Sequence, residues 1–290
     1  MESKENNSTA NTEISTANQI LQVLLLIGQI LWMWVEATYE ILKAIYRKVV
    51  PVPEKSVQGE IILITGAGHG IGKELALQFA SLGATVVCWD INKKNNEQTV
   101  KDIAAAGAPK AYAYVCDVSN RQAVFDMVQK VETEVGHITM LVNNAGIMPC
   151  HPLLDHTEAE IRKIFDINVF AHFWTLKAVL PNMLKNNHGH IVALSSMAGL
   201  LGLKNLVPYC ASKFAVRGLC KNPNIKYPWL LSPLPVKLVA KEIVGATLRD
   251  TLELSIPNYL LTLNHTLRLF PTKVPLLIKD FMGSSMDSDL

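Results

Sequence analysis

Three side chains stand at spacings that suit proton transfer. Ser196 follows an apolar run at residues 191–194, Tyr209 lies thirteen positions further on, and Lys213 comes four positions after the tyrosine. Positions i and i+4 share one face of a helix, so the Lys213 ammonium can lie beside the Tyr209 phenol. A free phenol has a pKa of about 10, and a nearby cation lowers it. We therefore predict that Tyr209 is a general acid/base whose pKa Lys213 lowers, and that Ser196 binds the substrate oxygen.

A glycine-rich segment comes directly after the apolar run at residues 61–64. Glycines let the backbone turn tightly and approach a pyrophosphate at the N-terminus of the helix that we expect over residues 73–81. The strand before the segment and the helix after it make this prediction stronger than a glycine motif alone. The residues expected to bind the cofactor here are Thr65, Gly66, His69, Gly70, Ile71 and Gly72.

Asp90 bears on the choice between NAD and NADP. It stands at the end of the second apolar run, about twenty residues after the glycines. A carboxylate in this place can bond both ribose hydroxyls of NAD and would repel the 2′-phosphate of NADP. Lys93 and Lys94 lie nearby, but they suit a solvated helix face. NAD is therefore favoured, and NADP is the alternative.

From Glu60 onward, apolar runs of strand length alternate with segments of helix length. The runs are Ile61–Ile64, Thr85–Trp89, Tyr112–Val115, Met140–Val142 and Ile191–Leu194. This rhythm is typical of successive βαβ units. It predicts an α/β fold, a Rossmann-like doubly wound parallel sheet with helices on both faces, in a domain that covers residues 60–290.

The order of these motifs resembles that of the short-chain dehydrogenase/reductase family, in its 16C group of retinol and steroid dehydrogenases. The motifs are TGxxxGxG at residues 65–72, Asn143-Asn144-Ala145-Gly146 after the fourth apolar run, Ser196, and Tyr209-xxx-Lys213. The likeness extends from about residue 59 to residue 219. It implies hydride transfer between a nicotinamide cofactor and a lipophilic alcohol or ketone.

The resemblance also implies roles for further residues. Asn168 matches the family position that carries a proton-relay water. Asp117 would meet the adenine ring, and an equal alternative is that it caps a helix beginning near Ser119. His69 and Ile91 stand where NADP-preferring members place Arg or Lys. The residues that the resemblance adds to the cofactor site are Asn144, Ala145, Gly146, Tyr209 and Lys213.

The first fifty residues differ in composition from the rest. Residues 1–19 are polar and are predicted to be a disordered tail. Residues 20–35 carry no charge and contain Trp32 and Trp34, which suit an interfacial aromatic belt. We predict an uncleaved membrane anchor helix over residues 20–50 and a proline-containing linker over residues 51–59. A helix in one leaflet and a buried helix of a soluble protein are the alternatives.

Basic residues predict the orientation of this anchor. Lys4 precedes the apolar core, whereas Lys43, Arg47, Lys48 and Lys55 follow it. The positive-inside rule then puts the catalytic domain in the cytosol. The resemblance implies the endoplasmic reticulum membrane or the surface of a lipid droplet.

Composition argues against two other classes of protein. The 27 basic and 25 acidic side chains give a net charge of +2, which does not suit a nucleic-acid partner. The five cysteines are odd in number and show no CxxC spacing. They argue against a zinc site and against a disulfide framework, so no metal is expected.

The family pattern breaks after Leu219. Family members continue with a long helix, a further strand and a loop that touches the nicotinamide. Here Pro223 and Pro228 follow, and then a helical stretch from Val236 to about Leu252. Compared with the family pattern, about thirty residues are absent here. This is roughly the size of a βαβ unit without one of its strands. We expect a disruption near residues 220–235 and an incomplete C-terminal part of the sheet, unless residues 225–231 supply a makeshift strand.

Two functions from different classes follow. The first is an active oxidoreductase of lipophilic alcohols and ketones at a membrane or lipid-droplet surface. The second is a catalytically inactive membrane-bound relative, a splice variant or decayed gene product, that at most binds nucleotide or a partner. The intact motifs favour the first, and the break favours the second. Whether the protein forms a homodimer is left open, because family members dimerise through the helix that is truncated here.

Overall fold

A computed structural model describes scattered positions between residues 24 and 50, and residues 53–108, 110–200, 202–219 and 236–249. The chain divides into two compact units, Met1–Pro53 and Glu54–Leu290. The predicted tail at residues 1–19 and the makeshift strand at residues 225–231 lie outside the described residues.

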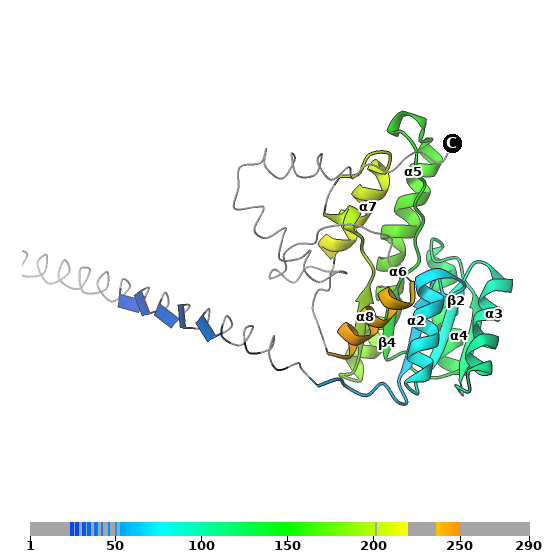
Figure 1. Cartoon of the computed structure of the whole chain (residues 1–290), viewed down its shortest axis with the longest axis horizontal. Coiled ribbons are helices and arrows are strands. Elements are labelled where there is room, and N and C mark those ends of the chain that lie inside the picture. Colours follow the sequence, from blue (N-terminus) through cyan, green and yellow to red (C-terminus); the bar gives the residue numbers. More distant parts are fainter. Residues whose placement is uncertain are drawn as a thin grey trace, which may run out of the picture. The chain divides into compact units, whose positions relative to one another are not determined.

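A parallel sheet forms the centre of the second unit (Figure 1). Its described strands are β1 Ile61–Thr65, β2 Thr85–Asp90, β3 Ala111–Val115, β4 Met140–Asn143 and β5 His190–Ala193. They lie in the order β3-β2-β1-β4-β5, and every pairing is parallel. The order reverses between β1 and β4, and ligands of such sheets bind at this point, outside the carboxyl ends of the strands. The predicted strands and the doubly wound parallel fold are confirmed.

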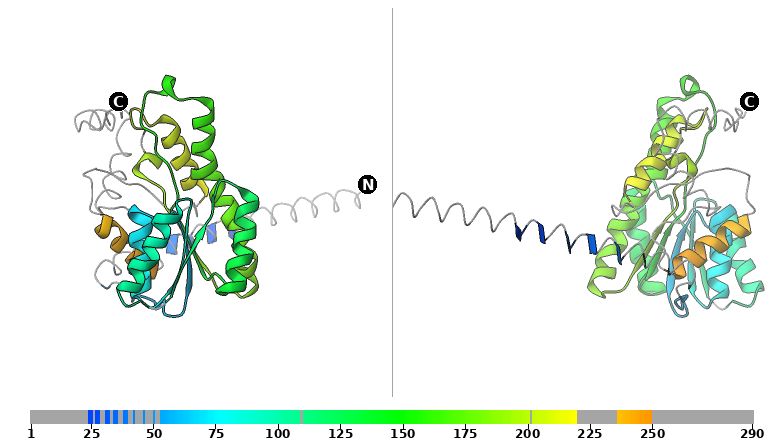
Figure 2. Two further views of the ribbon diagram at one scale, coloured as in Figure 1. Left: turned by 90° about the vertical axis from the view of Figure 1, so that its right-hand side faces the viewer. Right: turned by 60° about the vertical axis from the view of Figure 1, so that its left-hand side comes forward.

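Helices cover both faces of the sheet (Figure 2). Ile62 and Ile64 of β1 pack against one set of helices, and Leu63 between them packs against the other. The first set is α2 Gly70–Ser81, α3 Lys93–Ala105 and α8 Val236–Leu248, and the second is α4 Arg121–Glu134 and α6 Ala171–Lys185. Strand β1 is thus apolar at successive positions because both of its faces are buried.

The remaining elements stand around the carboxyl ends of the strands. They are a 3-10 turn Leu153–Asp155, helix α5 Glu158–Phe165, a π-helical turn Asp166–Phe170 that joins α5 to α6, a 3-10 turn Met197–Gly199 and helix α7 Val207–Leu219. Helix α7 carries Tyr209 and Lys213. The described part of α7 extends to Leu219, and α8 ends at Leu248, earlier than the predicted Leu252.

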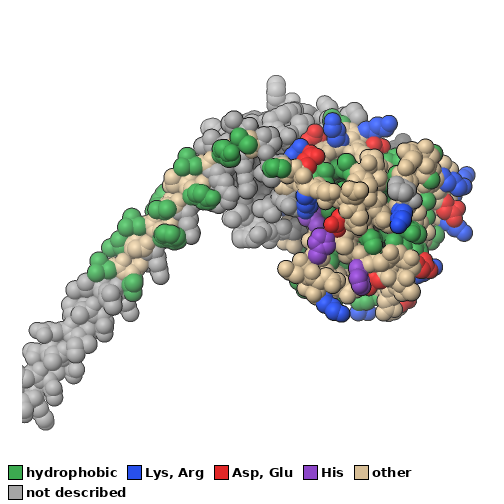
Figure 3. Space-filling view, turned by 90° about the horizontal axis from the view of Figure 1, so that it is seen from below, with side chains coloured by type: hydrophobic (Ala, Val, Ile, Leu, Met, Phe, Trp, Pro, Cys, Tyr) green, Lys and Arg blue, Asp and Glu red, His purple; other side chains and the backbone are tan. Residues whose placement is uncertain are grey.

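The described positions of the first unit between residues 24 and 35 are helical and expose apolar side chains (Figure 3). Trp32 and Trp34 are 64% and 63% exposed. Within the described residues, no helix is long and apolar enough to cross a membrane. The anchor at residues 20–50 therefore stays a prediction.

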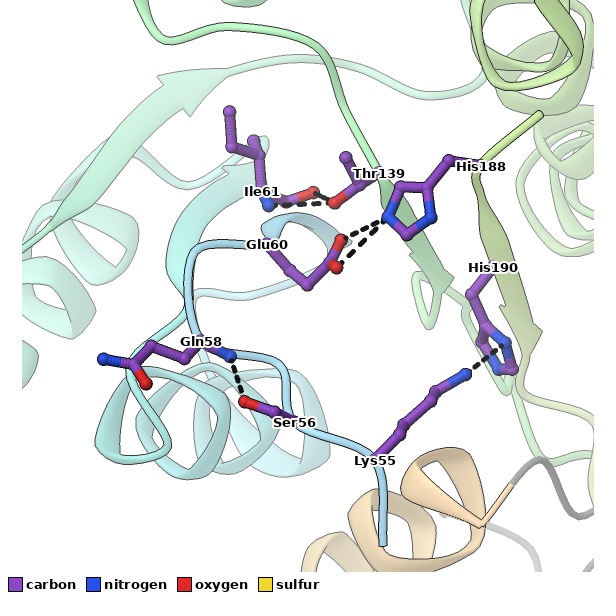
Figure 4. A network of polar contacts seen from close by, with 8 residues as sticks. All are labelled: Lys55, Ser56, Gln58, Glu60, Ile61, Thr139, His188 and His190. Atoms are coloured by element: carbon purple, nitrogen blue, oxygen red, sulfur yellow. Dashed lines mark hydrogen bonds and ion pairs between the residues drawn. The ribbon is translucent and has the colours of Figure 1, made fainter. Parts of the chain in front are cut away.

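Polar contacts tie together the amino ends of three strands, opposite the expected site (Figure 4). Glu60, just before β1, lies 3.0 Å from Nε2 of His188, just before β5. The hydroxyl of Thr139, just before β4, accepts a hydrogen bond from the backbone N–H of Ile61. Lys55 Nζ lies 3.2 Å from Nδ1 of His190. These contacts therefore join the segments that lead into β1, β4 and β5.

Candidate active site

The glycine-rich segment forms a tight turn between β1 and α2. Gly66 and Gly70 have φ angles of +68° and +56°, which favour glycine. A Cβ atom on Gly72 would overlap the carbonyl oxygen of Gly66 and would lie 2.5 Å from Nδ2 of Asn144. The turn therefore brings the start of α2 against the end of β1, where the helix N-terminus suits a pyrophosphate.

Thr65 and Asn144 join this turn to β4. The Thr65 hydroxyl accepts hydrogen bonds from the backbone N–H groups of Asn144 and Ala145, at 3.0 and 3.1 Å. The Asn144 side chain donates to the Thr65 carbonyl at 2.9 Å. The predicted cofactor residues at the ends of β1 and β4 therefore meet at the point where the strand order reverses.

Asp90 is a buried carboxylate beside the turn, with 7% of its surface exposed. It accepts hydrogen bonds from the backbone N–H of Gly68 and of Asn92, both at 2.8 Å. A carboxylate has about four acceptor positions, so acceptor capacity for ribose hydroxyls is left. A Cβ atom on Gly68 would lie 2.8 Å from Oδ2 of Asp90. Asp90 thus shapes the turn besides being placed to bind a ribose.

Asp117 and His69 lie at the edge of this region, and both are exposed. Asp117 accepts hydrogen bonds from the backbone N–H and the hydroxyl of Ser119, at 2.9 and 2.7 Å. The alternative that Asp117 caps the next helix is wrong, because Asn120 caps α4 by accepting from the N–H of Ala123. The contact of Asp117 with adenine stays a prediction.

Lys213 is buried, with 4% of its surface exposed, and its Nζ donates to the Leu194 carbonyl at 3.0 Å. The same atom lies 5.8 Å from the centroid of the Tyr209 ring. Burial lowers the pKa of Lys213 to about 8. The helical spacing thus brings the two residues together, as the sequence indicates.

The expected lowering of the tyrosine pKa is wrong for this structure. Burial raises the pKa of Tyr209, and a hydrogen bond with Ser196 opposes that rise only in part. The reason is desolvation, which penalises the phenolate, while the Lys213 ammonium is directed to a carbonyl.

The two neighbouring serines have different contacts. Ser195 donates its hydroxyl hydrogen bond to the Lys213 carbonyl at 3.0 Å. Ser196 begins the 3-10 turn Met197–Gly199, where its hydroxyl accepts from the N–H of Ala198 at 3.2 Å. Ser195 therefore holds α7 to the end of β5, and Ser196 remains the serine that faces Tyr209.

Asn168 lies in the π-helical turn and is fully buried. Its side chain accepts from the N–H of Ile147 at 2.8 Å, donates to the Ile147 carbonyl at 2.9 Å, and donates to the Ser212 hydroxyl at 3.0 Å. A Cβ atom on Gly146 would lie 3.2 Å from Oδ1 of Asn168 and 3.6 Å from Nζ of Lys213. The glycine therefore lets Asn168 and Lys213 approach the same stretch of backbone.

His172 is a site neighbour that the sequence analysis missed. It is 2% exposed, and its pKa is lowered to about 4, first by burial and then by the charge of Lys213. His172 is therefore neutral at pH 7 and adds no second cation near Lys213.

The chain matches the short chain dehydrogenase family model over residues 60–227. It is 40% identical over 278 residues to human epidermal retinol dehydrogenase 2, covering 86% of this chain and 90% of that protein. It is 36% identical to cattle short-chain dehydrogenase/reductase family 16C member 6, with 92% of each chain covered. Human 17-beta-hydroxysteroid dehydrogenase 13 is 44% identical, over 69% of this chain and 64% of that protein.

Solved structures of oxidoreductases are also similar to this chain. A metagenomic short-chain oxidoreductase in complex with NADP has a TM-score of 0.55 at 33% identity, over 57% of this chain and 75% of that chain. NAD⁺-bound xylitol dehydrogenase has a TM-score of 0.55 at 36% identity, over 57% and 64%. The chain belongs to the short-chain dehydrogenase/reductase family of NAD(P)-dependent oxidoreductases. Within that family it is a relative of the 16C type.

Proposed function

We propose that this protein interconverts a lipophilic alcohol, of the retinol or steroid type, and its carbonyl form, with NAD as the preferred cofactor. The observation that carries the proposal is the grouping of Tyr209, Ser196 and buried Lys213 at the carboxyl end of β5. The names of the retinol and 17-beta-hydroxysteroid dehydrogenase relatives support the substrate class. Bound NAD supplies the acceptor for hydride from the alcohol carbon.

The residues of the turn suit the cofactor. Gly66 and Gly70 have positive φ angles, and a Cβ atom on Gly72 would overlap the Gly66 carbonyl, so the glycines permit the tight turn that a pyrophosphate site needs. Asp90 would accept hydrogen bonds from the ribose hydroxyls and would repel a 2′-phosphate. Lys213 would hold the nicotinamide ribose. Asp90 is the observation that favours NAD over NADP.

The residues of the site would bind the substrate oxygen and transfer one proton. Ser196 would hydrogen-bond the substrate oxygen, and the Tyr209 hydroxyl would take the proton of the alcohol or return it to the carbonyl oxygen. At pH 7, a lysine with a pKa of about 8 is mostly protonated, so the Lys213 ammonium could donate to the nicotinamide ribose besides the Leu194 carbonyl. Asn168 would hold a water through which the proton leaves.

A panel assay tests the substrate class. Full-length protein in detergent is given NAD⁺ or NADP⁺ with all-trans-retinol, a 17β-hydroxysteroid or xylitol, and absorbance at 340 nm is followed. We expect turnover of a lipophilic alcohol with NAD⁺ and none of xylitol. Preferred turnover of xylitol would contradict the lipophilic class, and preferred use of NADP⁺ would contradict the role of Asp90.

The second candidate is an inactive relative that binds nucleotide. It is favoured by the short connection between α7 and α8, residues 220–235, where family members have a helix and a strand. The same protein should then show an NADH-induced rise in melting temperature but no turnover with any substrate. Insertion of the helix-strand segment of a close relative after Leu219 would restore turnover in that case.

We further propose that residues 20–50 hold the protein on the endoplasmic reticulum membrane or a lipid droplet, with the second unit in the cytosol. The uncharged run at residues 20–35 and the exposed Trp32 and Trp34 support this. Deletion of residues 1–50 should move the protein from the membrane pellet to the supernatant. Continued sedimentation of the deleted form with membranes, and not with aggregates, would refute the anchor.

A further inference from the structure

Two histidines and a glutamate form a cluster away from the residues assigned above. His151 lies in the loop between β4 and the 3-10 turn Leu153–Asp155, His156 follows that turn, and Glu160 lies in the first turn of α5. His151 Nε2 lies 3.0 Å from Oε2 of Glu160, and His156 Nδ1 lies 2.7 Å from the same oxygen. The centroids of the two imidazole rings lie 3.8 Å apart, and the ring planes are tilted by 31°.

Capping of α5 explains why Glu160 is in reach. Thr157 caps the helix by accepting from the N–H of Glu160 at 3.2 Å. In a Thr-x-x-Glu capping box the glutamate would turn back toward the cap residue. Here its carboxylate instead meets both histidines. The capped helix therefore presents one carboxylate to two imidazoles.

The histidines do not have the contacts of ordinary core residues. The side chain of His156 is fully buried, yet its Nε2 has no hydrogen-bond partner in the described structure, and neither does Nδ1 of His151. Buried polar atoms normally find partners. Each imidazole instead directs its one partnered nitrogen to the same carboxylate, so that three ligand atoms of three residues lie within 4.8 Å of one another.

We propose that His151, His156 and Glu160 bind a divalent transition-metal ion such as Zn²⁺. Two imidazoles and one carboxylate with a position left for water are a known set of zinc ligands. Imidazole nitrogen suits Zn²⁺, whereas Mg²⁺ and Ca²⁺ prefer oxygen. Ligand atoms of a tetrahedral zinc site lie about 3.3 Å apart. The partly exposed side chains of His151 and Glu160 would reach this spacing by small rotations. Each neutral imidazole would keep its one proton on the other ring nitrogen, so that the nitrogen facing Glu160 is free to coordinate the ion.

The ion would fix the loop that supports the proposed acid/base. Cys150, adjacent to His151, packs in a buried cluster with Leu206 and Cys210, against which Tyr209 lies. The backbone N–H of His151 also donates to the Asn205 carbonyl at 3.1 Å. A bond from the metal to Glu160 would join this loop to α5. The inference does not depend on the proposed function, because binding and melting report it without turnover.

The affinity should be moderate. Ligand histidines usually donate their second N–H to an acceptor, and loss of that contact weakens binding by about 10- to 100-fold. Neither histidine has such a partner in the described structure. We therefore expect an affinity well below that of a structural zinc site, with one ion per chain.

The test uses full-length protein with an affinity tag that lacks histidine, stripped by a chelator and then titrated with Zn²⁺. We expect one Zn²⁺ per chain and a higher melting temperature. Glu160→Gln and His151→Gln should each weaken binding at least tenfold, whereas the matched control Glu158→Gln, two positions earlier on the same helix, should change it less than twofold. Equal binding by wild type and both cluster variants, or no stoichiometric binding, would overturn the proposal.

A second measurement keeps the test valid if a variant does not fold. Wild-type protein titrated with Co²⁺ should develop the visible absorption of a four-coordinate nitrogen and oxygen site, and Zn²⁺ should remove it. An octahedral, aqua-like spectrum at saturation would overturn the proposal, because the histidines would not be ligands.

Discussion

Asp90→Ala should destabilise the protein even before any cofactor is added. The Asp90 carboxylate accepts two backbone hydrogen bonds, from Gly68 and Asn92, and is 7% exposed. A hydrogen bond to a charged group contributes about 1.5–3 kcal/mol, so the loss of both costs at least about 3 kcal/mol. For a domain of this size, that lowers the melting temperature by roughly 6–12 °C.

The matched control is Asp117→Ala. Asp117 also accepts the N–H two positions further on, that of Ser119, but it is exposed and has no contact with the glycine-rich turn among its hydrogen bonds. Its loss should cost about 1 kcal/mol or less. Differential scanning calorimetry of both variants without cofactor measures the difference.

The same variants separate the structural role of Asp90 from its role in cofactor choice. In the wild type, NADH should raise the melting temperature more than NADPH, and Asp90→Ala should narrow that difference. If Asp90→Ala melted within about 2 °C of the wild type, the structural reasoning would be refuted. If NADPH stabilised the wild type as much as NADH, the assignment of NAD would be refuted.

Two further predictions concern the turn and the amino ends of the strands. Gly72→Ala should abolish NADH binding and lower the free energy of unfolding by about 1–3 kcal/mol, because the new Cβ atom would overlap the backbone of Gly66. The control Gly245→Ala should have neither effect, because its Cβ atom would meet only the flexible end of a side chain. Burial raises the pKa of Glu60, but hydrogen bonds from Thr139 and His188 lower it overall. Its stabilisation is therefore fully present above the ordinary value of 4.5 and is lost as the pH falls through the lowered pKa. The difference in urea unfolding between Glu60→Gln and wild type should be largest at pH 7 and should shrink as the pH falls below 4.5.

The strands could be predicted from the sequence because both faces of the sheet are buried. Ile62, Leu63 and Ile64 are each fully buried, so an unbroken apolar run marks β1. The glycines are equally informative, since Gly66 and Gly72 are required by backbone geometry within a few residues of themselves. Signals of this kind depend on residues that are close together in the sequence, so they can be recognised before the structure is known.

Other features depend on packing between distant segments. The π-helical turn at Asp166–Phe170 accompanies the bonds of Asn168 to Ile147, which lies 21 positions earlier. The raised pKa of Tyr209 follows from its burial, which a helical spacing does not indicate. The meeting of His151 with Glu160 requires the fold of the intervening loop.

The transfer of deuterium from substrate to cofactor tests the central claim most directly. All-trans-retinol deuterated at the carbinol carbon is incubated with NAD⁺ and full-length protein, and the mass of the reduced cofactor is measured. Wild type should produce deuterated NADH, and Tyr209→Phe should do so at least about 100-fold more slowly while still binding NADH. Undiminished transfer by Tyr209→Phe would contradict the role of Tyr209. If the wild type bound NADH but transferred no deuterium from retinol or from a deuterated steroid alcohol, the oxidoreductase assignment itself would be contradicted.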